Sequence, residues 1–250
     1  MQRYFVDKAD WQGDKVTIRG DDVHHISRVM RMDAGDEIIC TQSGGKAAVC
    51  KIAELTADAV ICKVDSLMEE STELPVTVTI VQALGKGDKL ETVIQKGTEL
   101  GADQFIPYQA DRSVVKWDRK KAEKKAPRMQ KIAKEASEQS HRLKVPSVSG
   151  LHSINEILAL SDNYDVKIFA YEDEAKQEDY HSLSSVMASM SPGMRMIAVI
   201  GPEGGFSEKE VRKFYEAGFQ SVRLGPRILR METAPLYLLA SISYHFEELR

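Results

Sequence analysis

The sequence lacks an apolar run long enough to cross a membrane, and its first residues contain no apolar signal core. Its apolar stretches stop well short of the roughly 20 residues that a membrane helix needs, and it opens with the mixed segment MQRYFVDKAD. Cysteine is scarce: only Cys40, Cys50 and Cys62 occur, without the spacing of a metal knuckle. We therefore expect a cytoplasmic protein with buried, reduced thiols and no metal site.

Excess charge of either sign is also absent overall, but the charge is distributed unevenly. The 250 residues carry a net charge of −4. Residues 112–144 hold twelve Lys or Arg against four acids, so this segment is +8 and the rest of the chain is −12. A concentrated positive segment favours a polyanionic partner such as RNA. The same pattern is also typical of a solvated lysine-rich helix face.

Two patterns of hydrophobic residues predict an α/β protein with two domains. Residues 1–72 contain short β-rich runs separated by turn residues, which predicts a small barrel. In residues 73–250 strands alternate with helices, which favours a mostly parallel sheet covered on both faces. Long helices are expected at 118–141 and 234–249, with Pro127 kinking or breaking the first.

Three loops are placed to carry chemistry, because parallel sheets bind ligands beyond the carboxyl ends of their strands. They are FAYEDE (169–174), GPEGG (201–205) and LGPRILRMETA (224–234). GPEGG fits neither the phosphate loop, which needs a lysine, nor the dinucleotide fingerprint. Glu203 would repel a phosphate and suits hydroxyls, amines or a cationic ligand instead. A plain structural turn remains the alternative.

Helix caps are predicted after two of these loops. Ser207 and Glu210 have the spacing of a capping box, and Thr233 is placed to cap the last helix, with Pro235 in its first turn. Two Gly-Pro loops at neighbouring strand ends predict a pocket lined by backbone with few charges. Such a pocket suits an adenosyl ligand better than a nucleoside triphosphate.

IGPEGGFSEKEV (200–211) followed by LGPRILRMETAPLYLLASI (224–242) resembles the ribosomal RNA small-subunit methyltransferase E family of the SPOUT class. HHISRVMRM, QALGKGDKLETVIQKGTELG, DRSVVKW and EASEQSHR resemble segments of that family in the same order. The resemblance implies a trefoil-knotted methyltransferase domain at 73–250, a PUA-like RNA-binding barrel at 1–72 and a homodimer. It also implies S-adenosylmethionine as cofactor and methylation of ring nitrogen 3 of one uridine, in free 16S ribosomal RNA or in the assembled 30S subunit.

The same motifs imply a set of cofactor-binding residues and suggest catalytic ones. Because the methyl donor is already activated, the protein mainly aligns the reactants, but uridine must lose its ring proton. Glu138 is our first candidate for the base, with Glu203 and Glu232 as alternatives; a surface ion pair is the structural alternative for Glu138. Arg142 or Arg230 would stabilise charge on the uracil oxygens. The cofactor set is Phe169, Tyr171, Glu172, Ile200, Gly201, Pro202, Glu203, Gly204, Leu224, Gly225, Leu229, Arg230, Glu232, Thr233 and Ala234.

Basic residues spread over both domains are expected to contact RNA, with Trp117 or Tyr108 as stacking platforms unless these aromatics belong to the core. The expected RNA contacts are Arg28, Arg31, Lys86, Lys89, Arg112, Lys116, Lys121 and Lys125. Two other functions stay open at this point. One is a non-catalytic RNA-binding or ribosome-assembly protein that keeps the fold. The other is a nucleotide-dependent oxidoreductase, which the missing dinucleotide spacing disfavours.

Overall fold

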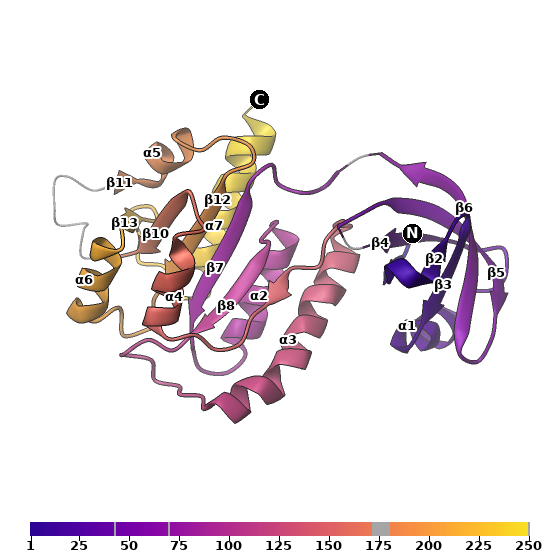
Figure 1. The fold of residues 1–250 in the computed structure, drawn as a ribbon, viewed down its shortest axis with the longest axis horizontal. Coiled ribbons are helices and arrows are strands. Elements are labelled where there is room, and N and C mark those ends of the chain that lie inside the picture. The colour runs from indigo at the N-terminus through magenta and orange to yellow at the C-terminus, as the bar shows by residue number, and fades with distance from the viewer. Residues whose placement is uncertain (43, 70, 172–180, 250) are drawn as a thin grey trace. The chain divides into compact units, whose positions relative to one another are not determined.

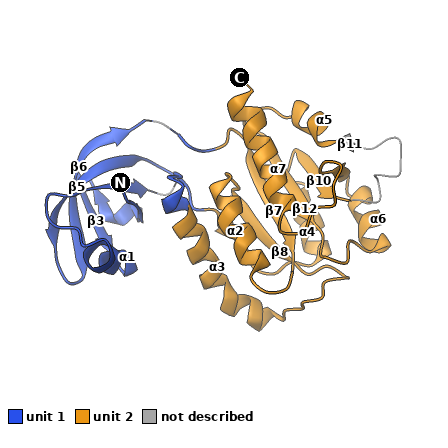
Figure 2. Ribbon diagram, turned by 180° about the vertical axis from the view of Figure 1, so that it is seen from behind, with its two compact units in different colours: residues 1–73, 137–145 blue, residues 74–136, 146–250 orange. Residues whose placement is uncertain are grey.

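The chain forms two compact units in a computed structural model that describes residues 1–42, 44–69, 71–171 and 181–249. Unit 1 comprises Met1–Glu73 and Ser137–Val145, and unit 2 comprises Leu74–Ala136 and Pro146–Arg250 (Figure 2). The first break falls one residue from the boundary expected from the sequence. Residues 137–145 differ from that expectation, because they pack with unit 1 although they follow the start of the second domain.

Unit 1 is built on a six-stranded sheet with the order β1-β4-β5-β6-β3-β2. β1 pairs with β4 in parallel, and the other pairs are antiparallel. Its strands are β1 (Arg3–Val6), β2 (Trp11–Gln12), β3 (Lys15–Arg19), β4 (Glu37–Gln42), β5 (Ala47–Leu55) and β6 (Ala59–Met68). Its helical segments are η1 (Lys8–Asp10), α1 (Asp21–His24) and the π-helical turn η2 (His25–Val29).

The core of unit 1 follows from strand alternation, which places every second side chain on one face. Val16 and Ile18 of β3 are buried, whereas Lys15 and Arg19 are exposed. The three cysteines lie in the same core and are free, so the prediction of buried, unpaired thiols is confirmed. Val23 of α1 also joins this core, which attaches the short helical segment to the sheet.

Unit 2 is built on a seven-stranded sheet in which every pair is parallel, as the alternation of strands and helices predicted (Figure 1). The order is β11-β13-β10-β12-β7-β8-β9. The strands are β7 (Thr77–Ala83), β8 (Gln104–Tyr108), β9 (Ser147–Val148), β10 (Val166–Ala170), β11 (His181–Ser182), β12 (Arg195–Ile200) and β13 (Gln220–Arg223). The helices are α2 (Lys89–Glu99), α3 (Arg119–Gln139), α4 (Ile154–Ser161), α5 (Leu183–Ala188), α6 (Glu208–Glu216), α7 (Ala234–Ser243) and the π-helical turn η4 (Tyr244–Glu248).

Helices cover both faces of this sheet. Ile106 of β8 belongs to a buried cluster with Ile157 of α4 and Phe214 of α6. Phe105, the preceding residue, points to the opposite face. There it meets α2 so closely that a Cβ added to Gly97 would lie 2.8 Å from its ring. α7 packs beside α2 on this second face. Helices therefore shield both faces of the sheet from solvent, and a ligand site is expected at the ends of the strands.

One expectation about helices was wrong in part: α3 is one continuous helix through Pro127, so the proline does not break it. Pro127 lies at an exposed position, where the carbonyl of Glu123 that loses its backbone N–H partner is not buried by other elements. The expected helix at 234–249 is confirmed, with α7 ending at Ser243 and η4 continuing the helical backbone to Glu248. No helix within the described ranges is long and apolar enough to span a bilayer.

Candidate functional site

The three loops singled out in the sequence begin side by side at one edge of the unit 2 sheet. Ala170, at the end of β10, is in register with Ile200 of β12 and with Val222 of β13. The backbone N–H of Tyr171 donates to the carbonyl of Val222 at 3.3 Å. The parallel register therefore brings together segments that begin near residues 171, 201 and 224. Glu172, assigned to the cofactor site from the sequence, lies outside the described residues.

Phe169 supports this edge from beneath rather than lining it. Its side chain is fully buried and stacks on Phe214 at a centroid distance of 5.2 Å. It also meets Phe206 edge-on at 5.8 Å. Among the expected cofactor residues, Phe169 thus contributes a side chain to the core.

The GPEGG loop needs small residues because its backbone is packed closely on two sides. A Cβ on Gly201 would lie 3.1 Å from the ring of Phe206. A Cβ on Gly204 would lie 3.3 Å from the backbone carbonyl oxygen of Arg112. The turn closes through a bond from the N–H of Gly205 to the carbonyl of Pro202 at 2.9 Å. The loop is therefore held against the segment that follows β8.

Glu210 is the buried carboxylate that fixes this loop and the start of α6. The predicted capping box is confirmed: the N–H of Ser207 donates to Glu210 at 2.7 Å, and Ser207 Oγ accepts from the N–H of Glu210. Glu210 also accepts hydrogen bonds from the N–H of Asp111 at 3.0 Å and from the hydroxyl of Tyr108. Burial, together with this carboxylate, raises the pKa of Tyr108. Tyr108 is therefore a core residue and cannot stack on RNA.

The second Gly-Pro loop is shaped by a left-handed residue and by a tight turn before α7. Gly225 has φ +76°, and a Cβ there would lie 3.3 Å from the hydroxyl of Tyr237. The N–H groups of Thr233 and Ala234 both donate to the carbonyl of Arg230, at 2.8 and 3.0 Å. Thr233 occupies the N-cap position but makes no side-chain capping bond, because its backbone is already helical. The predicted cap was thus right in position and wrong in mechanism.

Lys89, at the start of α2, joins the two Gly-Pro loops. Its Nζ lies 3.1 Å from Glu203 Oε1 and 3.2 Å from Glu232 Oε2. The hydrogen bond to Glu203 raises the pKa of Lys89 against the opposing effect of burial. Burial pushes the pKa of Glu203 upward, but backbone N–H groups and Lys89 together hold it below its usual range. The sequence had assigned Lys89 to RNA and the two glutamates to the cofactor site; the structure brings all three together.

The end of β7 packs against the second Gly-Pro loop next to this contact. The sequence analysis did not assign this strand end to the site. Gln82 pairs in register with Ile200 and is 1% exposed. Its Nε2 donates to the carbonyl of Met231 at 3.3 Å, while its Oε1 has no hydrogen-bond partner among the described residues. A Cβ on Gly85 would lie 2.7 Å from the sulfur of Met231. The sequence does contain a signal for Gln82, because this residue lies near the end of a fourth buried strand. Its place in the site can be recognised only once the strand order puts β7 beside β12.

The chemistry of these groups fits an adenosyl ligand better than a phosphate ligand. Leu224 is buried and Leu229 is half-buried, so the second loop offers apolar side chains. The buried Oε1 of Gln82 can accept an N–H. The ammonium of Lys89 is already paired with two carboxylates, and a triphosphate would meet net negative charge here.

The three proposed catalytic residues do not form one cluster within unit 2. Glu138 accepts a hydrogen bond from the N–H of Phe5 at 3.3 Å, within unit 1. Arg142 is 3% exposed and forms an ion pair with Glu73 at 2.5 Å, also in unit 1. Arg230 is exposed in the second loop, and its guanidinium makes no hydrogen bond or ion pair within the described ranges. Of the three proposed catalytic residues, only Arg230 therefore lies in one of the loops at the strand ends of unit 2.

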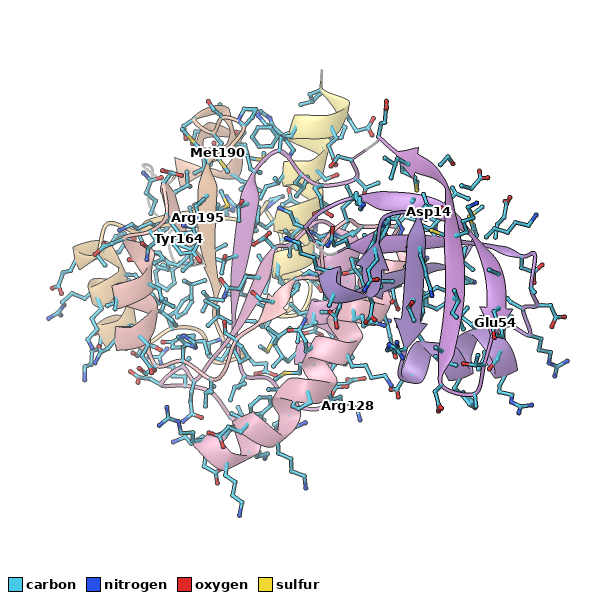
Figure 3. The ribbon with its side chains drawn as sticks, turned by 45° about the vertical axis from the view of Figure 1, so that its right-hand side comes forward. Asp14, Glu54, Arg128, Tyr164, Met190 and Arg195 are labelled. Atoms are coloured by element: carbon cyan, nitrogen blue, oxygen red, sulfur yellow. The ribbon has the colours of Figure 1, made fainter. Side chains whose placement is uncertain are left out.

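Basic side chains gather on the loop after β8 and on the first half of α3. Arg112, Lys116 and Lys121 are exposed, and Lys125 lies over the ring of Trp117 at 5.4 Å. Farther along α3, the basic side chain labelled in Figure 3 is Arg128, which pairs with Glu91 at 2.7 Å. Arg28 and Arg31 are exposed in unit 1, and Lys86 is exposed after β7. These positions fit the predicted RNA contacts without testing them.

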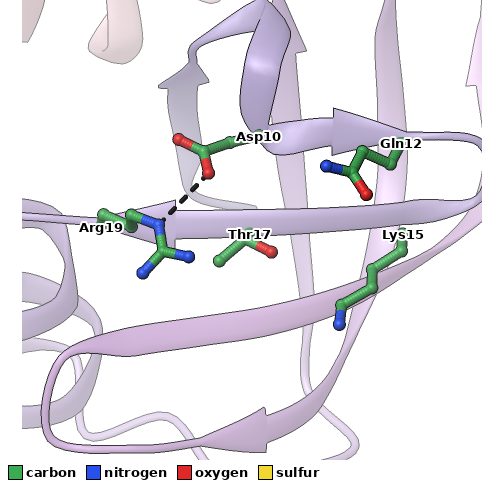
Figure 4. A pocket seen from close by; sticks show the side chains of 5 residues that line it. All are labelled: Asp10, Gln12, Lys15, Thr17 and Arg19. Atoms are coloured by element: carbon green, nitrogen blue, oxygen red, sulfur yellow. Dashed lines mark hydrogen bonds and ion pairs between the residues drawn. The ribbon is translucent and has the colours of Figure 1, made fainter.

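A polar hollow of about 170 Å³ lies at the β2–β3 edge of unit 1 and was not foreseen (Figure 4). Lys15, Thr17 and Arg19 extend from β3, with Gln12 of β2 and Asp10 beside them. Asp10 pairs with Arg19 at 3.2 Å, so one of its cations is already neutralised. No group of His, Cys, Asp or Glu within the described part of the chain could hold a metal ion.

Comparisons with known proteins agree with this architecture. Residues 72–243 match the model of an RNA methyltransferase domain, and residues 18–65 match that of an RNA methyltransferase PUA domain. The Bacillus subtilis ribosomal RNA small subunit methyltransferase E is 48% identical over 100% of this chain and 99% of its own length. The chain belongs to this methyltransferase family. Its Synechocystis member is 32% identical over 91% of this chain and 72% of its own length.

Solved structures of the family have the same fold. The Neisseria gonorrhoeae member, bound to S-adenosyl methionine, has a TM-score of 0.86 and is 28% identical, with 100% of both chains covered. Family membership confirms the α/β methyltransferase domain with an N-terminal PUA domain that the sequence motifs implied. A nucleotide-dependent oxidoreductase, the alternative outside this family, is set aside.

Proposed function

We propose that this protein uses S-adenosylmethionine to methylate ring nitrogen 3 of one uridine in small-subunit (16S) ribosomal RNA. The observation that carries the proposal is the meeting of the two Gly-Pro loops at adjacent parallel strand ends, where Lys89 joins Glu203 to Glu232. Membership of a family of small-subunit ribosomal RNA methyltransferases supports it. The trefoil knot and the homodimer belong to the same proposal.

S-adenosylmethionine, when bound, supplies a methyl group on a sulfonium, so the chain's own residues have two tasks. Leu224, Leu229 and the glycine-rich backbone bind and orient the adenosyl group, and Gln82 offers an acceptor for an N–H. The ring nitrogen gains a bond to carbon while the carbon–sulfur bond breaks, and the nitrogen's proton must leave. Arg230 is placed to stabilise the negative charge that this loss leaves on the uracil oxygens.

Glu138 and Arg142 remain our proposed base and second stabiliser. Both lie in unit 1, where Glu138 meets the N–H of Phe5 and Arg142 meets Glu73. We retain the sequence assignment of residues 1–72 to RNA binding and 73–250 to methyl transfer. Since ribosomal RNA is the substrate, we place the reaction in the cytoplasm, on free RNA or on the assembled 30S subunit.

Calorimetry tests the cofactor part of the proposal. S-adenosylmethionine should bind the purified protein with a measurable heat, whereas NADH should give none. Absence of binding at millimolar S-adenosylmethionine, with and without RNA, would contradict a methyltransferase role and favour a non-catalytic RNA-binding protein.

Nucleoside mass spectrometry tests the target. Small-subunit ribosomal RNA from cells that lack this protein should lose N3-methyluridine, and the wild-type gene should restore it. A variant with Arg230→Met should restore it poorly while still binding the cofactor. Persistence of N3-methyluridine without the protein would refute the uridine assignment even if the cofactor is correct.

A further inference from the structure

We propose that Lys89 is a positioning residue that locks both Gly-Pro loops to the start of α2 and so forms the cofactor pocket in advance of binding. The inference rests on the proposed function, because it assigns a role to a residue at that same site. Lys89 had been assigned to RNA from its position beside a glycine turn. Its observed contacts point inward, to two loops that the sequence places far apart.

The geometry allows one ammonium to serve both loops. Nζ lies 3.1 Å from Glu203 and 3.2 Å from Glu232, and the three side chains are only 27%, 32% and 21% exposed. Partial burial weakens screening by water, so such a pair stabilises more than an exposed one. Glu203 follows β12 and Glu232 precedes α7, so loss of the lysine would leave two carboxylates facing each other without a counter-ion.

Further contacts, independent of Lys89, join the end of β7 and the residues after it to the second Gly-Pro loop. The carbonyl of Met231 accepts a hydrogen bond from Gln82, and the sulfur of Met231 packs against the bare backbone of Gly85. A backbone N–H of Lys86 is also among the groups that lower the pKa of Glu203. The end of β7 and the segment after it therefore contact the second loop through the amide of Gln82, and both loops through the ammonium of Lys89. Lys89 is the member of this set whose charge can be removed without changing the backbone.

A loop that is ordered before binding spares the ligand the cost of ordering it. Removing Lys89 should consequently weaken cofactor binding, even though its ammonium is already paired within the protein. This distinguishes a positioning role from an RNA contact. An RNA contact would change the affinity for RNA and the salt dependence of that affinity, and would leave cofactor binding in the absence of RNA unaltered.

The test compares Lys89→Met with Lys96→Met by calorimetry with S-adenosylmethionine and without RNA. Lys96 lies on the same helix and pairs with Glu99 at 2.8 Å, so its removal is a matched loss of one lysine–carboxylate pair. We expect Lys89→Met to weaken binding about tenfold through lost preorganisation, and Lys96→Met to change it less than about twofold. In turnover, Lys89→Met should raise KM for the cofactor more than it lowers kcat.

A double-mutant cycle guards against a variant that merely folds poorly. Glu232→Gln should weaken cofactor binding on its own, and adding it to Lys89→Met should cost less than the sum of the two separate losses. Additive losses, or cofactor affinity within about twofold of wild type in Lys89→Met, would overturn the positioning role. Failure of the wild-type protein itself to bind S-adenosylmethionine would instead refute the proposed function, so the two failures are distinguishable.

Discussion

Replacing Glu210 by alanine should lower the free energy of unfolding of unit 2 more than any substitution at an exposed position of α6. This carboxylate is 2% exposed and accepts hydrogen bonds from Tyr108, Asp111 and Ser207. Its removal leaves the buried hydroxyl of Tyr108 and the two part-buried N–H groups of Asp111 and Ser207 without that acceptor, at about 1–3 kcal/mol for a fully unsatisfied buried group. Some of these donors will reach water through the cavity, so we expect a total loss of roughly 3–5 kcal/mol.

Two tryptophans allow this loss to be assigned to one unit. Trp11 lies in unit 1 and Trp117 in unit 2, and the sequence contains no others. In a Trp11→Phe background, fluorescence during urea unfolding therefore reports on unit 2 alone. The midpoint should fall at a similar slope, because a change in slope would mean that the compactness of one state had changed.

Glu208→Ala is the matched control, since Glu208 is exposed in the same first turn of α6. It should cost no more than about 0.5 kcal/mol. Glu210→Gln keeps the shape but places an amide donor among existing donors, so it should fall between the two. A loss below about 1 kcal/mol for Glu210→Ala would refute the reasoning, because it would mean that these three donors do not depend on this carboxylate.

Three further predictions concern the other contacts. Gly204→Val should weaken S-adenosylmethionine binding at least about tenfold in calorimetry, because the new side chain meets the backbone of Arg112; Gly150→Val, in open space, should not. Reversing charge with Lys121→Glu and Lys125→Glu should lower RNA affinity and flatten its salt dependence, and an unaltered slope would leave this face solvated. Arg142→Met should destabilise unit 1 by about 3 kcal/mol, read from Trp11, since it leaves the largely buried carboxylate of Glu73 without its cation and with only the N–H groups of Leu143 and Lys144 as partners.

Periodicity was enough to predict most of the fold. The alternation of Val16 and Ile18 with exposed neighbours, and the alternation of strands with helices after Pro75, are local patterns that need no knowledge of the partner strand. Local patterns failed where an environment decided the outcome. A proline in the middle of a helix was expected to kink or break it, but α3 continues through Pro127, which lies at an exposed position. The exposure of that position cannot be predicted from the proline alone.

The site was predictable in part for the same reason. Glycine and proline marked the loops after β12 and β13, and Ser207 with Glu210 marked a capping box, all within one short segment each. Gln82 and Met231 were missed, and Lys89 was assigned to RNA, because the role of each depends on the order of the parallel strands. Nothing local states that β7 lies beside β12.

Strand order also explains the carboxylate in the GPEGG loop. Taken alone, Glu203 places an uncompensated negative charge where a glycine-rich turn would ordinarily receive an anion. The start of α2 supplies Lys89, and the second loop supplies Glu232. Three charged groups therefore occupy that position, and their combined formal charge is −1. A cluster of net negative charge disfavours phosphates at this point. Lys89 therefore orders the two loops without turning the pocket into a phosphate site, because its single positive charge is outnumbered by the two carboxylates.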